Sequence, residues 1–149
     1  YADDVYQVAL RITASRADAE DVTQNVFAGL PEALSAYGGT GELGAWIRRV
    51  ATRGALLLLR QNRRQQRYER EAERHAPKSE PPDAVEARLT LEWVLGRMPE
   101  DWRVVYVLKE MEGHSHEEIA DLLGISVGAS TVRLHRARRF LRDRLEGRI

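Results

Sequence analysis

Residues 115–125 constrain the fold of this chain more than any other segment, because they fix the ends of two helices. Ser115 and Glu118 have the spacing of a capping box, in which the serine hydroxyl and the glutamate carboxylate each accept a hydrogen bond from the other residue's amide. This pattern predicts a short helix over 116–123. Gly124 supplies the left-handed residue that ends it, and Ser126 starts another helix directly afterwards. Two helices must therefore meet at a tight turn.

The helix after Ser126 is expected to be amphipathic. Arginines cover its outer faces, and an inward line repeats at spacings of three and four: Val127, Ser130, Leu134, Ala137, Leu141 and Leu145. A capped helix with the small residue Ala120, a glycine turn, the apolar Ile125 and a long basic helix are the parts of a helix-turn-helix. In that motif the start of the second helix enters the major groove of DNA, and arginines further along hold the phosphate backbone. The alternative interpretation is an ordinary helical hairpin with a solvated arginine face.

A proline-rich segment divides the chain. Three of the five prolines lie in 76–82, a stretch that breaks every periodic pattern and predicts an extended linker. We therefore expect an all-α fold of two small helical domains, 1–75 and 83–149, joined by this linker. The helix-turn-helix lies in the second domain.

Helices are also expected throughout the first domain. One is predicted by four apolar residues at helical spacing: Val5, Val8, Ala9 and Ile12. Asp18 suits the N-cap of the next helix, and Pro31 predicts a stop or kink in it. A glycine-rich loop at 37–41 precedes a long helix over about 43–73, whose second half is dense in arginine and glutamine.

The second domain is expected to hold about four helices. Asp83 can cap one that runs to Met98, Pro99 takes the first position of the next, and Gly113 ends it. The two helices of the helix-turn-helix follow.

Charge is arranged in blocks, although the formal net charge is zero. Residues 45–75 hold nine basic and three acidic side chains, and residues 133–149 hold seven and two. The segments 1–44 and 76–132 are acidic. Two basic blocks predict two contacts with a polyanion such as nucleic acid, although either block alone is equally well interpreted as a solvated helix face.

Several other kinds of site are excluded by composition. The chain has no cysteine, so disulfides and thiolate metal ligands are absent, and a cytoplasmic localisation is expected. His114 and His116 lack the acidic partners of a metal cage, and no catalytic constellation stands out. We therefore expect no metal, no cofactor and no enzymatic activity. The longest apolar run, 55–59, is too short for membrane insertion.

Both halves resemble an extracytoplasmic-function (ECF) sigma factor, the small two-domain class of the sigma-70 family. Residues 18–27 resemble the acidic helix that docks on core RNA polymerase, and residues 45–51 resemble the helix that reads and helps to open the −10 promoter element. Residues 117–126 and 133–138 resemble the helix-turn-helix that reads the −35 element. That last motif also occurs in other bacterial regulators, whereas the motifs in this order are far more specific.

The resemblance implies a transcription initiation factor that binds core RNA polymerase and promoter DNA. The residues expected to bind polymerase are Asp18, Glu20, Asp21, Gln24 and Phe27. Those expected at the −10 element are Tyr37, Thr40, Trp46, Arg49, Arg53, Arg60, Arg63 and Arg64, with core packing as the alternative role of Trp46. Those expected at the −35 element are Ser126, Gly128, Ser130, Thr131, Val132, Arg133, Arg136 and Arg139. The family also implies an anti-sigma partner.

Three places depart from the family pattern. An asparagine is usual near Gly54, and a helical, often aromatic, residue is usual at Pro31. Ser130 falls on the inward line where valine is usual, and burial of its hydroxyl costs free energy unless it finds a partner. Val132 then points outward, where it can touch a thymine methyl group.

The alternative function is a stand-alone helix-turn-helix transcriptional regulator whose first half senses a signal or dimerises. The acidic helix at 18–24 together with the basic helix at 46–64 favours the sigma factor. An enzyme has no supporting arrangement of residues.

Overall fold

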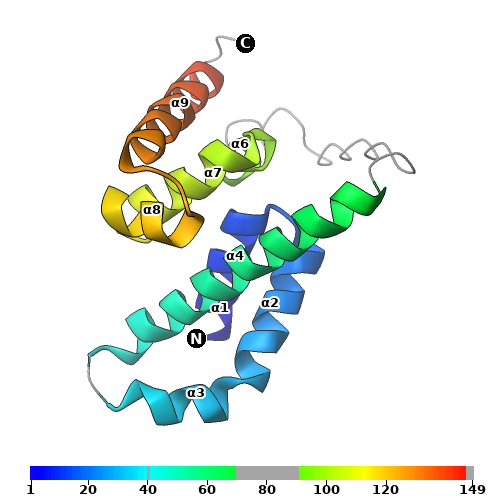
Figure 1. Cartoon of the computed structure of the whole chain (residues 1–149), viewed down its shortest axis with the longest axis vertical. Helices are drawn as coiled ribbons and strands as arrows, with labels where there is room; N and C mark the ends of the chain where they lie inside the picture. Colours follow the sequence, from blue (N-terminus) through cyan, green and yellow to red (C-terminus); the bar gives the residue numbers. More distant parts are fainter. Residues whose placement is uncertain (40, 70–90, 147–149) are drawn as a thin grey trace. The chain divides into compact units, whose positions relative to one another are not determined.

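The computed structural model describes residues 1–39, 41–69 and 91–146, apart from the side chains of residues 36 and 66–69. All regular structure in these ranges is helical, which confirms the predicted all-α fold (Figure 1). The chain divides into two compact units, Tyr1–Lys78 and Ser79–Ile149. The predicted linker at 76–82 and the predicted cap Asp83 lie outside the described residues. No described helix is both long and apolar enough to cross a membrane.

The described part of the first unit consists of α1 (Ala2–Thr13), α2 (Arg16–Ala28), α3 (Leu30–Tyr37) and α4 (Leu43–Glu69). Helices α1 and α2 pack on each other, and both pack on α4. The predicted apolar line of α1 is buried, as are Val22 and Val26 of α2. Helix α4 buries a line at four-residue spacing: Ile47, Ala51, Ala55 and Leu59. One face of α4 is therefore turned inward along four turns, and the other remains exposed.

The start of α2 differs from the prediction. Ser15, not Asp18, is the N-cap, because its hydroxyl accepts a hydrogen bond from the Asp18 amide at 3.2 Å. Asp18 therefore lies in the first turn, where the helix dipole favours a carboxylate. Its Oδ2 atom accepts a hydrogen bond from Nδ2 of Asn62 at 3.2 Å, which ties α2 to α4.

The predicted break at Pro31 is confirmed, and a separate helix follows it. Helix α2 ends at Ala28, and Pro31 lies in the first turn of α3, where the missing N–H has no helical acceptor to lose. Gly38 ends α3 with a φ of 69°. Tyr37, predicted in the loop, is the last residue of this helix.

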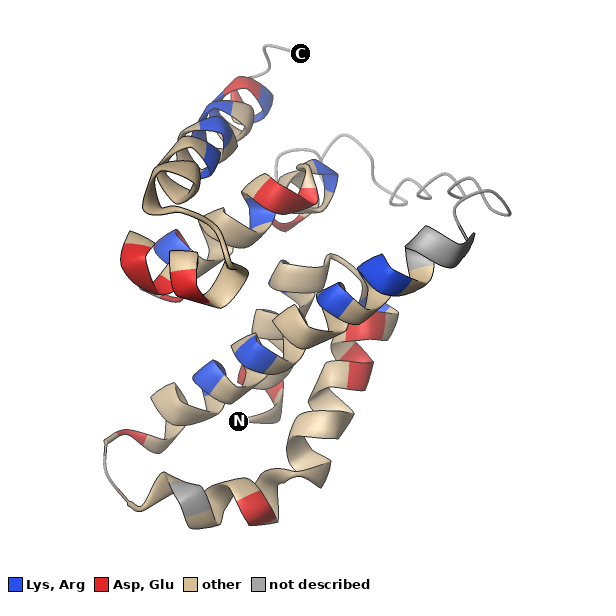
Figure 2. Cartoon of the chain, viewed as in Figure 1, with Lys and Arg blue, Asp and Glu red and all other residues tan. Residues whose placement is uncertain are grey.

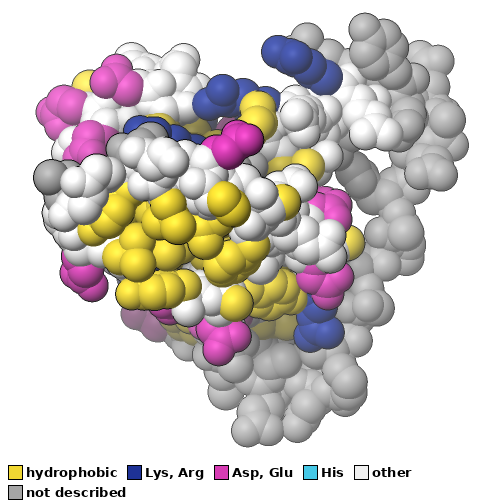
Figure 3. All heavy atoms as spheres, turned by 90° about the horizontal axis from the view of Figure 1, so that it is seen from below, with side chains coloured by type: hydrophobic (Ala, Val, Ile, Leu, Met, Phe, Trp, Pro, Cys, Tyr) yellow, Lys and Arg dark blue, Asp and Glu magenta, His cyan; other side chains and the backbone are white. Residues whose placement is uncertain are grey.

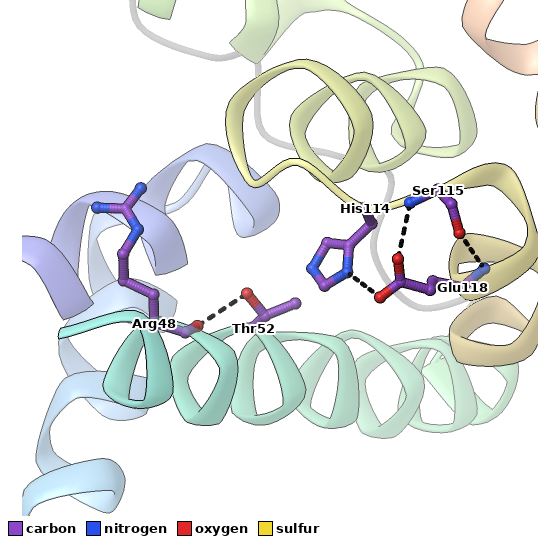
Figure 4. Close-up of polar contacts among 5 residues, drawn as sticks. All are labelled: Arg48, Thr52, His114, Ser115 and Glu118. Carbon is purple, nitrogen blue, oxygen red and sulfur yellow. Dashed lines mark hydrogen bonds and ion pairs between the residues drawn. The ribbon is translucent and has the colours of Figure 1, made fainter. Parts of the chain in front are cut away.

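Gly54 lies where α4 approaches α2 closely. A Cβ atom at Gly54 would lie 3.4 Å from Val22 and 3.8 Å from Val26, which is ordinary van der Waals contact. Thr52 is also buried, and its hydroxyl donates to the Arg48 carbonyl at 2.9 Å (Figure 4). This hydroxyl needs no partner from another helix.

The described part of the second unit consists of α6 (Leu91–Arg97), α7 (Glu100–Tyr106), a π-helical turn (Val107–Met111), α8 (His116–Leu123) and α9 (Val127–Leu145). Pro99 is the N-cap of α7 and not its first helical residue, so the predicted start was wrong by one position. Gly113 has a φ of 75°, as expected of a residue that follows a helix end. Helix α9 packs on α6, α7 and α8 around buried Val94, Leu95, Val105, Leu108 and Ile119.

The predicted inward line of α9 is right in its middle and wrong at its ends. Ser130, Leu134, Ala137 and Leu141 are buried, whereas Val127 and Leu145 are 43% and 42% exposed. The end positions have the correct spacing, but spacing buries a side chain only where another element covers it.

Ser130 finds the partner that its burial requires. The residue is fully buried, and its Oγ atom shares a hydrogen bond of 2.7 Å with Nδ1 of His116, the first residue of α8. The two helices of the motif are thus joined by a polar contact as well as by apolar packing.

We predict that Ser130→Ala destabilises the second unit by about 1–2 kcal/mol, because it leaves the His116 imidazole without this partner. His116→Ala should cost a similar amount, and the double variant less than the sum, with a coupling of about 1 kcal/mol. Unfolding is followed by fluorescence in a Trp46→Phe background, where the two remaining tryptophans, Trp93 and Trp102, both lie in the second unit. Additive effects would show that the hydrogen bond contributes nothing.

Candidate nucleic-acid interface

Residues 115–126 fold as predicted. The Glu118 amide donates to Ser115 Oγ at 3.1 Å, and the Ser115 amide donates to Glu118 Oε1 at 3.1 Å, which completes the capping box (Figure 4). Gly124 ends α8 with a φ of 68°. Ser126 caps α9 by accepting from the Ala129 amide at 3.0 Å. The turn is closed by its own hydrogen bonds, so the start of α9 has a defined position relative to α8.

Within this turn, the hydrogen bonds to the Glu118 carboxylate shift its pKa. Hydrogen bonds from the amide and hydroxyl of Ser115, and then from His114, lower the pKa of Glu118 below its ordinary value of 4.5. Oε2 of Glu118 lies 3.5 Å from Nδ1 of His114 (Figure 4). The ionised carboxylate is therefore the form that the folded turn prefers.

The arginines of α9 fall into two groups. Arg133 lies 3.9 Å from Asp101 of α7, Arg138 pairs with Glu110, and Arg144 lies 4.6 Å from the centroid of the Phe140 ring. Other arginines are exposed and have no ion pair among the described residues: Arg136, Arg139 and Arg142. Of the predicted −35 residues, Arg136 and Arg139 are therefore available to DNA phosphates, whereas Arg133 is half-buried against α7.

The first six residues of α9 carry no charge (Figure 2). Gly128, Val132, Arg136 and Arg139 recur at spacings of three and four, so they share the face that lies opposite the buried line. Val132 is 46% exposed at the centre of this face. A Cβ atom at Gly128 would meet only Ser126 Oγ, at 3.9 Å, so packing does not require glycine there.

A second basic face runs along α4 (Figure 2). It consists of residues at spacings of three and four: Trp46, Arg49, Arg53, Leu57, Arg60 and Arg64. The arginines are exposed, and Leu57 is 52% exposed among them. Arg63 is exposed but lies off this register. The sequence prediction missed Leu57, although its position four residues after Arg53 was the available signal.

An aromatic pair lies at the start of α4. The rings of Tyr37 and Trp46 have centroids 5.2 Å apart and planes tilted by 46°. The Tyr37 hydroxyl donates to the Gly41 carbonyl. Both aromatic side chains are half-buried, so Trp46 contributes to packing and keeps surface for a ligand. Thr40, predicted in the same loop, lies outside the described residues.

The predicted polymerase-binding residues of α2 lie in different environments. Glu20, Asp21 and Gln24 are exposed, and Phe27 is half-buried. Asp18 is half-buried and bonded to Asn62, so it serves contacts within the first unit. The acidic surface of α2 is therefore centred on Glu20 and Asp21.

Apolar side chains gather on the face of the molecule that Figure 3 shows. After Phe27 of α2, helix α3 contributes three apolar residues to this kind of surface. Leu30 is half-buried, and Pro31 and Leu34 are exposed, with Leu34 43% exposed. The sequence prediction missed this apolar surface because it contained no separate helix at 30–37. Contiguous exposed apolar surface is typical of protein–protein contacts.

Comparisons with known proteins match both units. The family described as sigma-70 region 2 matches residues 1–65, and the family described as sigma-70, region 4, matches residues 88–141. The ECF RNA polymerase sigma factor SigE of Mycolicibacterium smegmatis is 34% identical over 97% of this chain, which spans 58% of that relative's length. The RNA polymerase sigma factor CarQ of Myxococcus xanthus is 31% identical, with 91% of this chain and 79% of the relative covered. The ECF RNA polymerase sigma factor SigW of Bacillus subtilis is 28% identical, with 97% and 84% covered.

A solved structure shares the fold. It is described as the co-crystal structure of the sigma factor RpoE in complex with the anti-sigma factor NepR from Bartonella quintana. The TM-score is 0.64 at 19% identity, and the match covers 97% of this chain and 91% of that chain.

We predict that the stability of the second unit falls as the pH drops from about 4.5 through the folded-state pKa of Glu118. The folded state holds the ionised carboxylate, so its contribution is complete above the ordinary pKa and is lost once the group is protonated. Glu118→Gln keeps an acceptor in the capping box but cannot titrate there, so it should flatten this limb of the stability profile. Chemical denaturation of both proteins, from neutral pH down into the acid limb below 4.5, measures it; equal slopes in both proteins would contradict the assignment.

We also predict that Arg136→Ala weakens binding of duplex DNA at every sequence and lowers the slope of log affinity against log salt by about 0.9, the value for one phosphate contact. Arg142→Ala is the matched control, because Arg142 is an exposed arginine near the end of α9, about 120° around the helix axis from Arg136. Filter binding over a salt series measures both slopes. An unchanged slope for Arg136→Ala would remove Arg136 from the phosphate contacts.

Proposed function

Because this chain belongs to the ECF class of the sigma-70 family, we propose that it is an RNA polymerase sigma factor that binds core polymerase, contacts the −10 and −35 elements and directs promoter-specific initiation. It acts by recognition and helps to melt the −10 element, and polymerase carries out the chemistry. The observation that carries the proposal is the pair of basic faces, on α4 and on α9, within units that match sigma-70 regions 2 and 4 in that order. The cytoplasm is where such a factor meets its polymerase.

The α4 face suits a melted −10 element. The exposed arginines Arg49, Arg53, Arg60 and Arg64 follow a strand of phosphates by charge, with Arg63 alongside. The half-buried Trp46 and the exposed Leu57 offer apolar surface on which unstacked bases can lie. Tyr37 lies against Trp46, where a flipped base is received, and Thr40 is proposed for the same role.

The α9 face suits a duplex −35 element. The start of the helix, from Ser126 to Val132, enters the major groove, and Arg136 and Arg139 hold phosphates along it. Ser130 and Arg133 act from behind this surface: Ser130 bonds to His116, and Arg133 pairs with Asp101. Their role is to position the helix.

The α2–α3 surface suits core polymerase. Helix α2 presents charge and polarity through Glu20, Asp21 and Gln24, and the half-buried Phe27 is followed in the chain by the exposed apolar residues Pro31 and Leu34 of α3. A charged margin beside an apolar centre is the usual anatomy of a protein interface. An anti-sigma protein is a further partner, since the structural neighbour from Bartonella quintana is held in such a complex.

We predict that Glu20→Lys/Asp21→Lys lowers the affinity for core RNA polymerase at least tenfold, because two pairs of opposite charges become like charges at the contact. Asp18 is left unchanged, since its bond to Asn62 belongs to the fold. The control is Asp3→Lys, which reverses an exposed carboxylate of α1 and is compared with each single variant of α2; Asp4 is left unchanged because it lies 3.9 Å from Arg48 of α4. Complex formation with core polymerase is measured by native electrophoresis, and promoter-dependent transcripts are then counted.

Two results would count against the proposal. Equal losses in the α1 variant and the single α2 variants would mean that α2 is not the docking face. A wild-type chain that binds duplex DNA but forms no complex with core polymerase would be a stand-alone regulator and not a sigma factor.

A further inference from the structure

The hydroxyl groups at the start of α9 are all engaged within the protein. Ser126 Oγ accepts from the Ala129 amide at 3.0 Å, and Ser130 Oγ is bonded to His116 at 2.7 Å. Thr131 is exposed, but its hydroxyl donates back to the Val127 carbonyl at 3.1 Å. Within residues 126–132, all of which the structure describes, the side-chain donor that these bonds leave free is the O–H of Ser126, which only accepts in the cap and lies before the first helical residue.

The surface that remains at this point is apolar. Val132 is 46% exposed on the outward face, whereas Val127, 43% exposed, lies about 140° around the helix axis from it, one turn before the exposed Thr131. Gly128 has no side chain and has open space where one would lie, so the backbone of the first turn can approach a ligand closely. Arg136 follows one turn after Val132 on the same face, and Arg139 lies one turn further. An apolar tip is thus followed by two exposed positive charges.

This combination matches one chemical group of the DNA major groove. The arginines attract phosphates and bring the helix into the groove, where thymine alone among the four bases presents a methyl group. Resting on the proposed function above, we propose that the −35 element of this factor is read at its centre through thymine C5-methyl groups, with Val132 as the specificity-determining residue. A polar base contact then comes from the exposed His135, further along α9, while Arg136 and Arg139 hold phosphates.

The energetics set the size of the effect. Burying one methyl group stabilises a complex by an amount that corresponds to about fourfold in affinity. Replacing thymine by deoxyuracil removes that methyl and leaves both the groove shape and the O4 acceptor in place. Replacing cytosine by 5-methylcytosine adds the methyl without the O4 acceptor. The two replacements therefore isolate the methyl group from hydrogen bonding.

The test uses the full chain bound to core polymerase. Duplexes with a random −35 region are selected, and each thymine of the selected element is replaced singly by deoxyuracil. We expect thymine to be enriched, with affinity falling roughly three- to fivefold at one or two adjacent positions. At the same positions, 5-methylcytosine should bind more tightly than cytosine. A selected element without thymine, or equal affinities for thymine and deoxyuracil at every position, would overturn the inference.

Variants identify the residue that reads the methyl. Val132→Ser should abolish the discrimination between thymine and deoxyuracil, and Val132→Ile should retain it. Leu145→Ser is the matched control, because Leu145 is another exposed apolar residue of α9, 42% exposed at its far end. Discrimination that survives in Val132→Ser would remove Val132 from the role. If the holoenzyme does not form at all, the proposed function fails first, and that failure is visible before any DNA is added.

Discussion

The buried face of each of the two long helices, α4 and α9, determines which of their side chains are exposed to ligands. In α9 the buried line contains Ser130, Leu134, Ala137 and Leu141, and in α4 it repeats every four residues from Ile47. Turning α9 by one residue, about 100°, would expose Leu134 and Leu141 at a cost of roughly 3–6 kcal/mol. A single hydrogen bond contributes about 1 kcal/mol, so the leucines fix the rotation of α9 and Ser130 has to follow. The outward faces, basic in both helices, are a consequence of that packing.

The sequence was sufficient wherever a local rule had one solution. The capping box at Ser115, the left-handed Gly124 and the break at Pro31 each depend on residues within four positions of one another, and all three appear in the structure. The N-cap of α2 was predicted wrongly because Ser15 and Asp18 are both good caps, and only the backbone shows which amide is free. The exposure of Val127 and Leu145 was missed for another reason. Periodicity gives the direction of a side chain but not whether a neighbouring element covers it.

Sequence reasoning did not predict the contacts that residues of the candidate sites make with distant parts of the chain. The bond between Asp18 and Asn62 spans 44 positions, and through it a predicted docking residue also holds α2 to α4. The ion pair between Arg133 and Asp101 likewise links a predicted DNA contact to α7. Both residues belong to motifs that resemble the family, and a motif alone does not reveal the contacts that its residues make with distant parts of the chain.

The exchange of polar and apolar character around Ser130 follows from the same packing argument. A serine on the inward line is tolerated because His116, at the start of α8, supplies a polar atom 2.7 Å away. The valine two positions later is then left on the surface, where it has no core to fill. An exposed valine on an otherwise basic face contributes nothing to the stability of the free protein that a polar residue would not. Its contribution has to come from whatever covers it in a complex. The arginines that follow Val132 on the same face favour a polyanion as the partner that covers it. In DNA, the only apolar group of matching size at the base edges is the methyl group of thymine.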